Sequence, residues 1–99
     1  MLNIESKKNA AELSVALAGR LDTNTAPELE KVLNTSLDGV ETLCIDMEQL
    51  DYISSAGLRV LLAAQKTMNK QGEMKVLHVN EMIMEIFEVT GFSDILTIA

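Results

Sequence analysis

The spacing of apolar residues switches repeatedly between two periods, and this feature constrains the fold of the chain more than any other. Segments that alternate apolar and polar side chains predict strands, whereas apolar residues three and four positions apart predict helices. The predicted strands cover residues 2–6, 13–17, 40–47 and 74–79, and the predicted helices cover residues 25–38, 58–70 and 81–90. Two hairpin strands followed by alternating helices and strands describe an α/β fold, a mixed β-sheet with helices packed against it.

Glycines and capping residues predict where several of these elements begin and end. Gly19 is expected to end the second strand, and Thr25 with Glu28 has the spacing of a capping box at the start of the first helix. Asn80 is expected to cap the last helix. Residues 93–99 are compatible with either a brief helix or an edge strand.

The third predicted strand carries a continuous apolar run, Leu43-Cys44-Ile45. Such a run is typical of a strand that is covered on both faces, so we place it in the middle of the sheet and expect Cys44 to be buried. Asp46 is expected to close this strand and to begin a turn. A lone cysteine forms no internal disulfide, which fits a reducing compartment.

Length and charge limit the organisation and the partners of the chain. Its 99 residues, of which 47% are hydrophobic, predict a single domain over residues 1–99. The net charge of −7 argues against nucleic acid and favours a protein partner with a basic face. There is no apolar run long enough to cross a membrane and no secretory signal, so we expect a cytoplasmic protein without direct membrane insertion.

The residues that enzymes and metal sites require are scarce. A hydrolytic serine needs a base, and the only histidine, His78, falls within a predicted strand, where a hydrogen-bonded structural role is favoured. One cysteine and one histidine at unrelated positions do not form a metal-ligand set, and no glycine-rich phosphate loop is present. We therefore expect no catalytic residues, no metal and no cofactor, and any phosphate on this chain would come from another protein.

Two hydroxyls stand where a loop gives way to the second helix. Ser54 and Ser55 precede Gly57, and hydroxyls at a helix start either cap the helix or are available for modification. Free amides at the same place favour an anion. Asp22 follows the second strand, where a turn role is favoured locally, although its loop is expected at the same sheet edge as the loop that contains the serines.

Four segments together resemble a known protein family. They are Gly19-Arg20-Leu21-Asp22, Leu43-Cys44-Ile45-Asp46-Met47, the stretch from Tyr52 to Leu62, and Thr90-Gly91-Phe92. In order and spacing they resemble the STAS domain family, specifically the small single-domain anti-sigma-factor antagonists of bacteria. The resemblance covers nearly the whole chain and implies a STAS-like fold.

The resemblance implies a partner-switching mechanism. In this family the unphosphorylated antagonist binds an anti-sigma serine kinase and frees a sigma factor, and the kinase then uses its own ATP and magnesium to phosphorylate the antagonist. A serine phosphatase resets the cycle. The family acceptor lies two residues before the motif glycine, which is Ser55 before Gly57 here, with Ser54 in the place often held by Asp and Ala56 in the place of a second hydroxyl.

The resemblance also implies a partner-binding surface around Ser55. Its expected members come from the loop after the second strand, the end of the third strand and the start of the following helix. They are Asp22, Thr23, Asp51, Ser54, Ala56, Gly57 and Arg59. Because acidic neighbours do not neutralise an added phosphate, we expect phosphorylation to weaken docking.

Two other functions stay open at this point. One is a STAS accessory subunit of a membrane transport ATPase that is never phosphorylated, in which Ser55 is only a helix cap. The other is a serine hydrolase that uses His78 as its base. The first alternative is the stronger, since no nucleophile-elbow pattern surrounds either serine.

Overall fold

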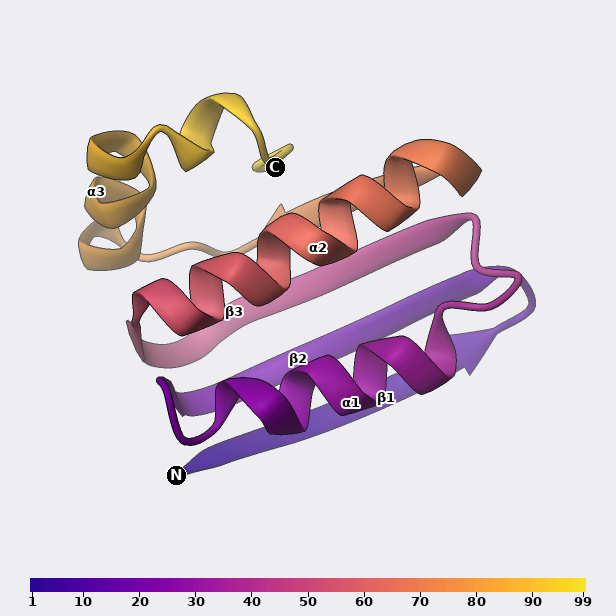
Figure 1. Cartoon of the computed structure of the whole chain (residues 1–99), viewed down its shortest axis with the longest axis horizontal. Helices are drawn as coiled ribbons and strands as arrows, with labels where there is room; N and C mark the ends of the chain where they lie inside the picture. The colour runs from indigo at the N-terminus through magenta and orange to yellow at the C-terminus, as the bar shows by residue number, and fades with distance from the viewer.

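In the computed structural model, which describes all residues from 1 to 99, four strands form one sheet in the order β1-β2-β3-β4 (Figure 1). Their bounds are Leu2–Asn9 for β1, Glu12–Leu21 for β2, Thr42–Ile53 for β3 and Glu73–Leu77 for β4. β1 pairs with β2 in an antiparallel manner, whereas β2, β3 and β4 pair in parallel. The predicted mixed sheet is confirmed.

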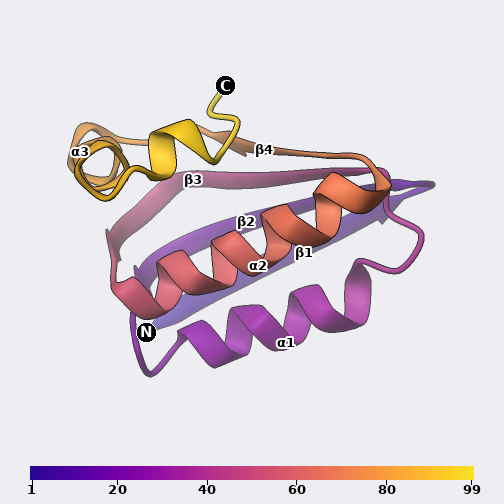
Figure 2. The same cartoon turned by 45° about the horizontal axis from the view of Figure 1, so that its top comes forward.

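The helices are α1 (Ala26–Ser36), α2 (Ser55–Gln71) and α3 (Glu81–Thr90), followed by a 3₁₀ turn at Phe92–Asp94. α1 and α2 lie side by side along one face of the sheet, and α3 lies across the end of the molecule where β3 runs into α2 (Figures 1 and 2). Beyond the 3₁₀ turn, Ile98 makes a single parallel bridge to Val76. The last residues thus contain both a brief helix and a strand-like contact. No helix combines the length and the apolar character that crossing a membrane demands.

β3 buries only every second side chain, because helices α1 and α2 cover the same face of the sheet. Leu43, Ile45 and Met47 are fully buried, whereas Cys44 is half-buried on the opposite face. The prediction that this strand is covered on both faces is therefore wrong, and so is the fully buried position of Cys44. A run of apolar residues is found in strands that are covered on both faces. It is also found in strands that place a small residue such as cysteine on a partly exposed face, so the run does not distinguish the two.

β3 is longer than predicted, because it continues past Met47 to Ile53. Its register with β2 slips after Asp46 and again after Leu50, so the strand carries two bulges. Asp46 lies at the first bulge, where its carboxylate Oδ1 accepts a hydrogen bond from the backbone N–H of Glu48 at 2.9 Å. The prediction that Asp46 closes the strand is wrong, since its turn-like hydrogen bond forms a bulge inside the strand.

β2 also runs through its predicted end. Gly19 lies inside the strand with a φ of +102°, and a Cβ there would overlap the carbonyl oxygen of Met1. Arg20 then donates its backbone N–H to that same oxygen at 3.1 Å. Gly19 therefore permits a close approach of the N-terminus and does not end the strand.

The predicted capping box at the start of α1 does not form. Thr25 is the N-cap residue, but its side chain makes no capping hydrogen bond. Its Oγ1 instead accepts from the backbone N–H of Asp22 at 2.8 Å and donates to the carbonyl oxygen of Arg20 at 2.7 Å. The hydroxyl is occupied by the preceding loop, which leaves Glu28 without its expected partner.

β4 ends at Leu77, two residues before the predicted end of this strand. His78 follows it with a φ of +57°, a conformation that residues other than glycine seldom adopt. Asn80 then caps α3 as predicted, because its Oδ1 accepts from the backbone N–H of Ile83 at 2.9 Å. His78 is therefore an exposed loop residue rather than a strand residue.

The start of α2 packs directly onto the ends of β2 and β3 at Gly57. This residue is buried, and a Cβ added to it would lie 2.7 Å from Cγ of Leu21 and 2.9 Å from Cγ1 of Ile53. Leu21 is itself completely buried. A side chain at position 57 would therefore push α2 away from the sheet.

We expect Gly57→Ala to lower the free energy of unfolding by about 1 kcal/mol, because overpacking outweighs the better helix propensity of alanine. Urea unfolding measures the change. Thr67→Ala, at an exposed position of the same helix, serves as the control and should not destabilise the protein. A higher urea midpoint for Gly57→Ala would contradict the close packing described above.

Candidate functional site

The carboxyl ends of β2 and β3 meet at one edge of the sheet. Leu21 is the register partner of Ile53, and the backbone N–H of Ser54 donates to the carbonyl oxygen of Leu21 at 2.9 Å. The loop that leads into α1 and the first turn of α2 are therefore neighbours, as Figure 1 shows at the end where both helices begin. The predicted meeting of the two loops at one edge is found in the structure.

Asp22 organises the loop between β2 and α1. Its Oδ1 accepts hydrogen bonds from the backbone N–H of Asn24 at 3.0 Å and of Thr25 at 3.1 Å. Burial would raise the pKa of the Asp22 carboxyl, but these hydrogen bonds and the Arg20 guanidinium outweigh that effect and lower the pKa below its ordinary value of 3.8. The locally favoured turn role is correct, and at neutral pH the carboxylate is ionised.

The two serines have different surroundings. Ser54 is the N-cap residue of α2 in an extended conformation, yet its Oγ is buried and has no hydrogen-bond partner. Ser55 is the first residue of the helix and is exposed. Neither hydroxyl makes a hydrogen bond to protein, so the first-turn amides of α2 are not capped by a side chain.

A shallow hollow lies between the starts of α1 and α2. Thr23, Ala56 and Arg59 line it together with Pro27 and Glu30. The structure thus gathers three of the predicted partner-binding residues around one depression next to Ser55.

The remaining predicted residues divide into exposed and buried ones. Asp51 is exposed near the end of β3, and Asp22 is partly exposed in the loop before α1. Gly57 is buried beneath this surface against Leu21 and Ile53. Gly57 positions the start of α2 on the sheet and does not itself contact a partner, because a buried glycine presents no side chain.

Sequence reasoning missed Arg20 and Tyr52 at the same edge. The Arg20 guanidinium lies 4.3 Å from the centre of the Tyr52 ring, and its Nε lies 3.8 Å from Oδ2 of Asp22. Arg20 and Tyr52 are register partners in the parallel ladder. The signal that pairs them is the bulged register of β3, which does not appear in the hydrophobic pattern.

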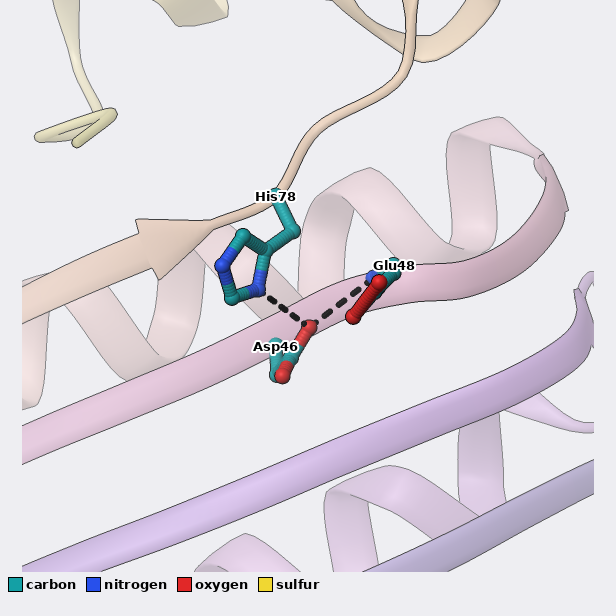
Figure 3. Close-up of side chains that lie close together, drawn as sticks. All are labelled: Asp46, Glu48 and His78. Carbon is teal, nitrogen blue, oxygen red and sulfur yellow. Dashed lines mark hydrogen bonds and ion pairs between the residues drawn. The ribbon is translucent and has the colours of Figure 1, made fainter.

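A second polar group lies on the open face of the sheet, at the first bulge of β3. Nδ1 of His78 lies 3.0 Å from Oδ1 of Asp46, and Figure 3 shows the ring pointing from the end of β4 toward that carboxylate. Asp46, Glu48 and His78 offer ligand atoms within 4.8 Å of one another, a set that suits a divalent transition metal. Asp46 Oδ1 already accepts from His78 and from the backbone of Glu48, so the arrangement is satisfied by hydrogen bonds alone.

The positions of His78 and the two serines do not support the serine hydrolase hypothesis. The only side-chain partner of His78 is Asp46, and no hydrogen bond joins the histidine to either serine. Burial and the nearby Glu12 raise the pKa of the Cys44 thiol, which therefore stays protonated at neutral pH. The structure therefore has no serine hydrogen-bonded to His78 as its base, and Cys44 is not a thiolate.

Comparison with known proteins identifies the family. The family model of the STAS domain matches residues 2–99. The chain belongs to the STAS domain family. It is 34% identical over 97 residues to the "Anti-sigma-B factor antagonist" of Staphylococcus aureus (strain NCTC 8325 / PS 47), a match that covers 96% of this chain and 90% of the relative.

Solved structures of STAS proteins share this fold. An anti-sigma factor antagonist from Mycobacterium paratuberculosis superimposes with a TM-score of 0.88 at 21% identity, over 99% of this chain and 85% of the other. SpoIIAA of Bacillus in its phosphorylated form matches with a TM-score of 0.77 at 17% identity, over 98% of this chain and 91% of the other. These relatives are regulatory proteins, and the sheet and helices of this chain follow the STAS architecture.

The Asp46–His78 pair predicts a measurable titration. The hydrogen bond and the charge of Asp46 raise the pKa of His78 above its ordinary value of 6.5. The contribution of the charged imidazole to stability is therefore complete below pH 6.5 and is lost as the pH rises through the raised pKa. NMR titration of the imidazole should show Asp46→Asn returning the pKa toward its ordinary value.

Glu48→Gln is the matched control for this titration, because Glu48 is the weakest of the influences on His78. It should lower the pKa of the imidazole less than Asp46→Asn does. An unchanged histidine titration in Asp46→Asn would show that the pair does not form in solution.

Proposed function

We propose that this STAS domain is an anti-sigma-factor antagonist that acts in the cytoplasm by partner switching. In its unphosphorylated form it binds an anti-sigma serine kinase, and a sigma factor is released. Phosphorylation of Ser55 ends this binding, and a serine phosphatase restores the active form. The 34% identity to the anti-sigma-B factor antagonist of Staphylococcus aureus, over nearly the whole chain, supports the assignment.

The observation that carries the proposal is the difference in exposure between the two serines. Ser55 is exposed at the first position of α2, where another protein can reach it, whereas the Ser54 Oγ is buried. A kinase must bring the acceptor oxygen in line with the γ-phosphate of its nucleotide, so only an accessible hydroxyl can serve. Ala56 offers no competing acceptor.

The charges around Ser55 explain how one phosphate changes binding. A phosphoserine carries about −1.5 to −2 charges at neutral pH, and it would join the ionised Asp22 and the exposed Asp51 on a chain of net charge −7. Burying this much negative charge in an interface costs several kcal/mol, so we expect affinity for the kinase to fall by about two to four orders of magnitude.

The chain supplies the acceptor, and the partner supplies the reagents. ATP and magnesium belong to the kinase, because this chain has neither a glycine-rich phosphate loop with its lysine nor a kinase set of metal-binding acids. The role of the STAS domain is to hold Ser55 on a rigid helix start. No refolding of the antagonist is needed for the switch.

A kinase assay tests the acceptor. The serine kinase encoded in the same genome, incubated with ATP and this protein, should add one phosphate to the unmodified chain and to Ser54→Ala, but none to Ser55→Ala. Intact mass and isothermal titration measure incorporation and binding. The proposal is wrong if Ser55→Ala is phosphorylated normally, or if the phosphorylated protein binds the kinase as tightly as the unmodified one.

A further inference from the structure

Building on the proposed phosphorylation of Ser55, we propose that Arg59 binds the resulting phosphate and is thereby withdrawn from the partner-binding surface. Ser55 and Arg59 are four residues apart in α2 and are both exposed. Side chains at this spacing lie on the same face of a helix, with about 5–6 Å between their Cβ atoms. The long guanidinium side chain therefore reaches the phosphate within one helical turn.

Arg59 is a cation without a partner. In the unmodified protein it takes part in no ion pair and no hydrogen bond, whereas Arg20 is engaged with the Asp22 carboxylate and the Tyr52 ring. The two segments that flank the site, residues 21–30 and 51–58, contain no lysine or arginine. Arg59 is thus the nearest unengaged positive charge along the chain.

The charged groups around the site favour this pairing over the alternatives. Glu30 of α1 lines the same hollow as Arg59, whereas neither Asp22 nor Asp51 does. No carboxylate lies in the first turn of α2 itself. A phosphate carries nearly twice the charge of Glu30 and accepts a bidentate guanidinium, so it competes successfully for Arg59.

The pairing gives phosphorylation two effects on one surface. The phosphate adds negative charge where the partner docks, and it removes the only free cation from the hollow that Thr23 and Ala56 also line. The switch then depends on the loss of this exposed cation as well as on repulsion.

The phosphate pKa tests this inference directly. Phosphoserine is installed at position 55 during translation, with a phosphoserine-charged suppressor tRNA, and its titration is followed by ³¹P NMR. We expect the guanidinium to hold the second pKa of the phosphate below its ordinary value of about 6. Arg59→Gln should lower the second ionisation constant by roughly threefold to tenfold, which raises this pKa.

Two further variants sharpen the experiment. Lys66→Gln removes one positive charge from an exposed position of the same helix, about 16 Å along the helix axis from Ser55. It should leave the titration of the phosphate unchanged. Arg59→Lys should restore part of the acidity lost in Arg59→Gln. Equal titrations of Arg59→Gln and Lys66→Gln would overturn the inference.

This test does not depend on any kinase, because the phosphoserine is introduced by translation. A kinase that ignores Ser55 would refute the proposed function and leave the ion pair standing. A titration insensitive to Arg59 would refute the ion pair and leave Ser55 as the acceptor.

Discussion

The parallel pairing of β2 with β3 is the constraint on which the site depends. It places Leu21 beside Ile53, and the hydrogen bond from Ser54 N–H to the Leu21 carbonyl then ties the two following segments together. Gly57 completes the arrangement by letting α2 lie directly on both strand ends. A loop rich in polar contacts and a helix start with an exposed serine are thereby held at one edge of the sheet.

The electrostatic character of this edge follows from the same backbone geometry. Backbone amides of the turn stabilise the ionised form of Asp22, and Arg20 is already engaged by Asp22 and Tyr52. At this edge Arg59 is the free cation, and it lies one helical turn from the exposed Ser55. Such a surface changes its net charge sharply when one hydroxyl is modified, without any rearrangement of the strands beneath it.

Much of the fold could be predicted from the sequence, because the period of the apolar residues distinguishes helices from strands. The mixed sheet, the three helices and the Asn80 cap were predicted in this way. The bulges of β3 were not, since a bulge adds one residue to a strand without a local signal, and Asp46 appeared to end a strand that it only bends. The Thr25 capping box failed because the hydroxyl binds the backbone of Asp22 and Arg20, a competition visible only in three dimensions.

The candidate site likewise has features that the sequence predicts and features that only the structure shows. The meeting of the Asp22 loop and the serine pair at one sheet edge was predictable from loop position, whereas the burial that separates Ser54 from Ser55 and the engagement of Arg20 required the packed structure. Peptide mapping by mass spectrometry, on the protein purified from its own cells, tests directly whether Ser55 is the phosphate acceptor. Phosphate on Ser55 is the predicted result, and phosphate confined to another residue would contradict it.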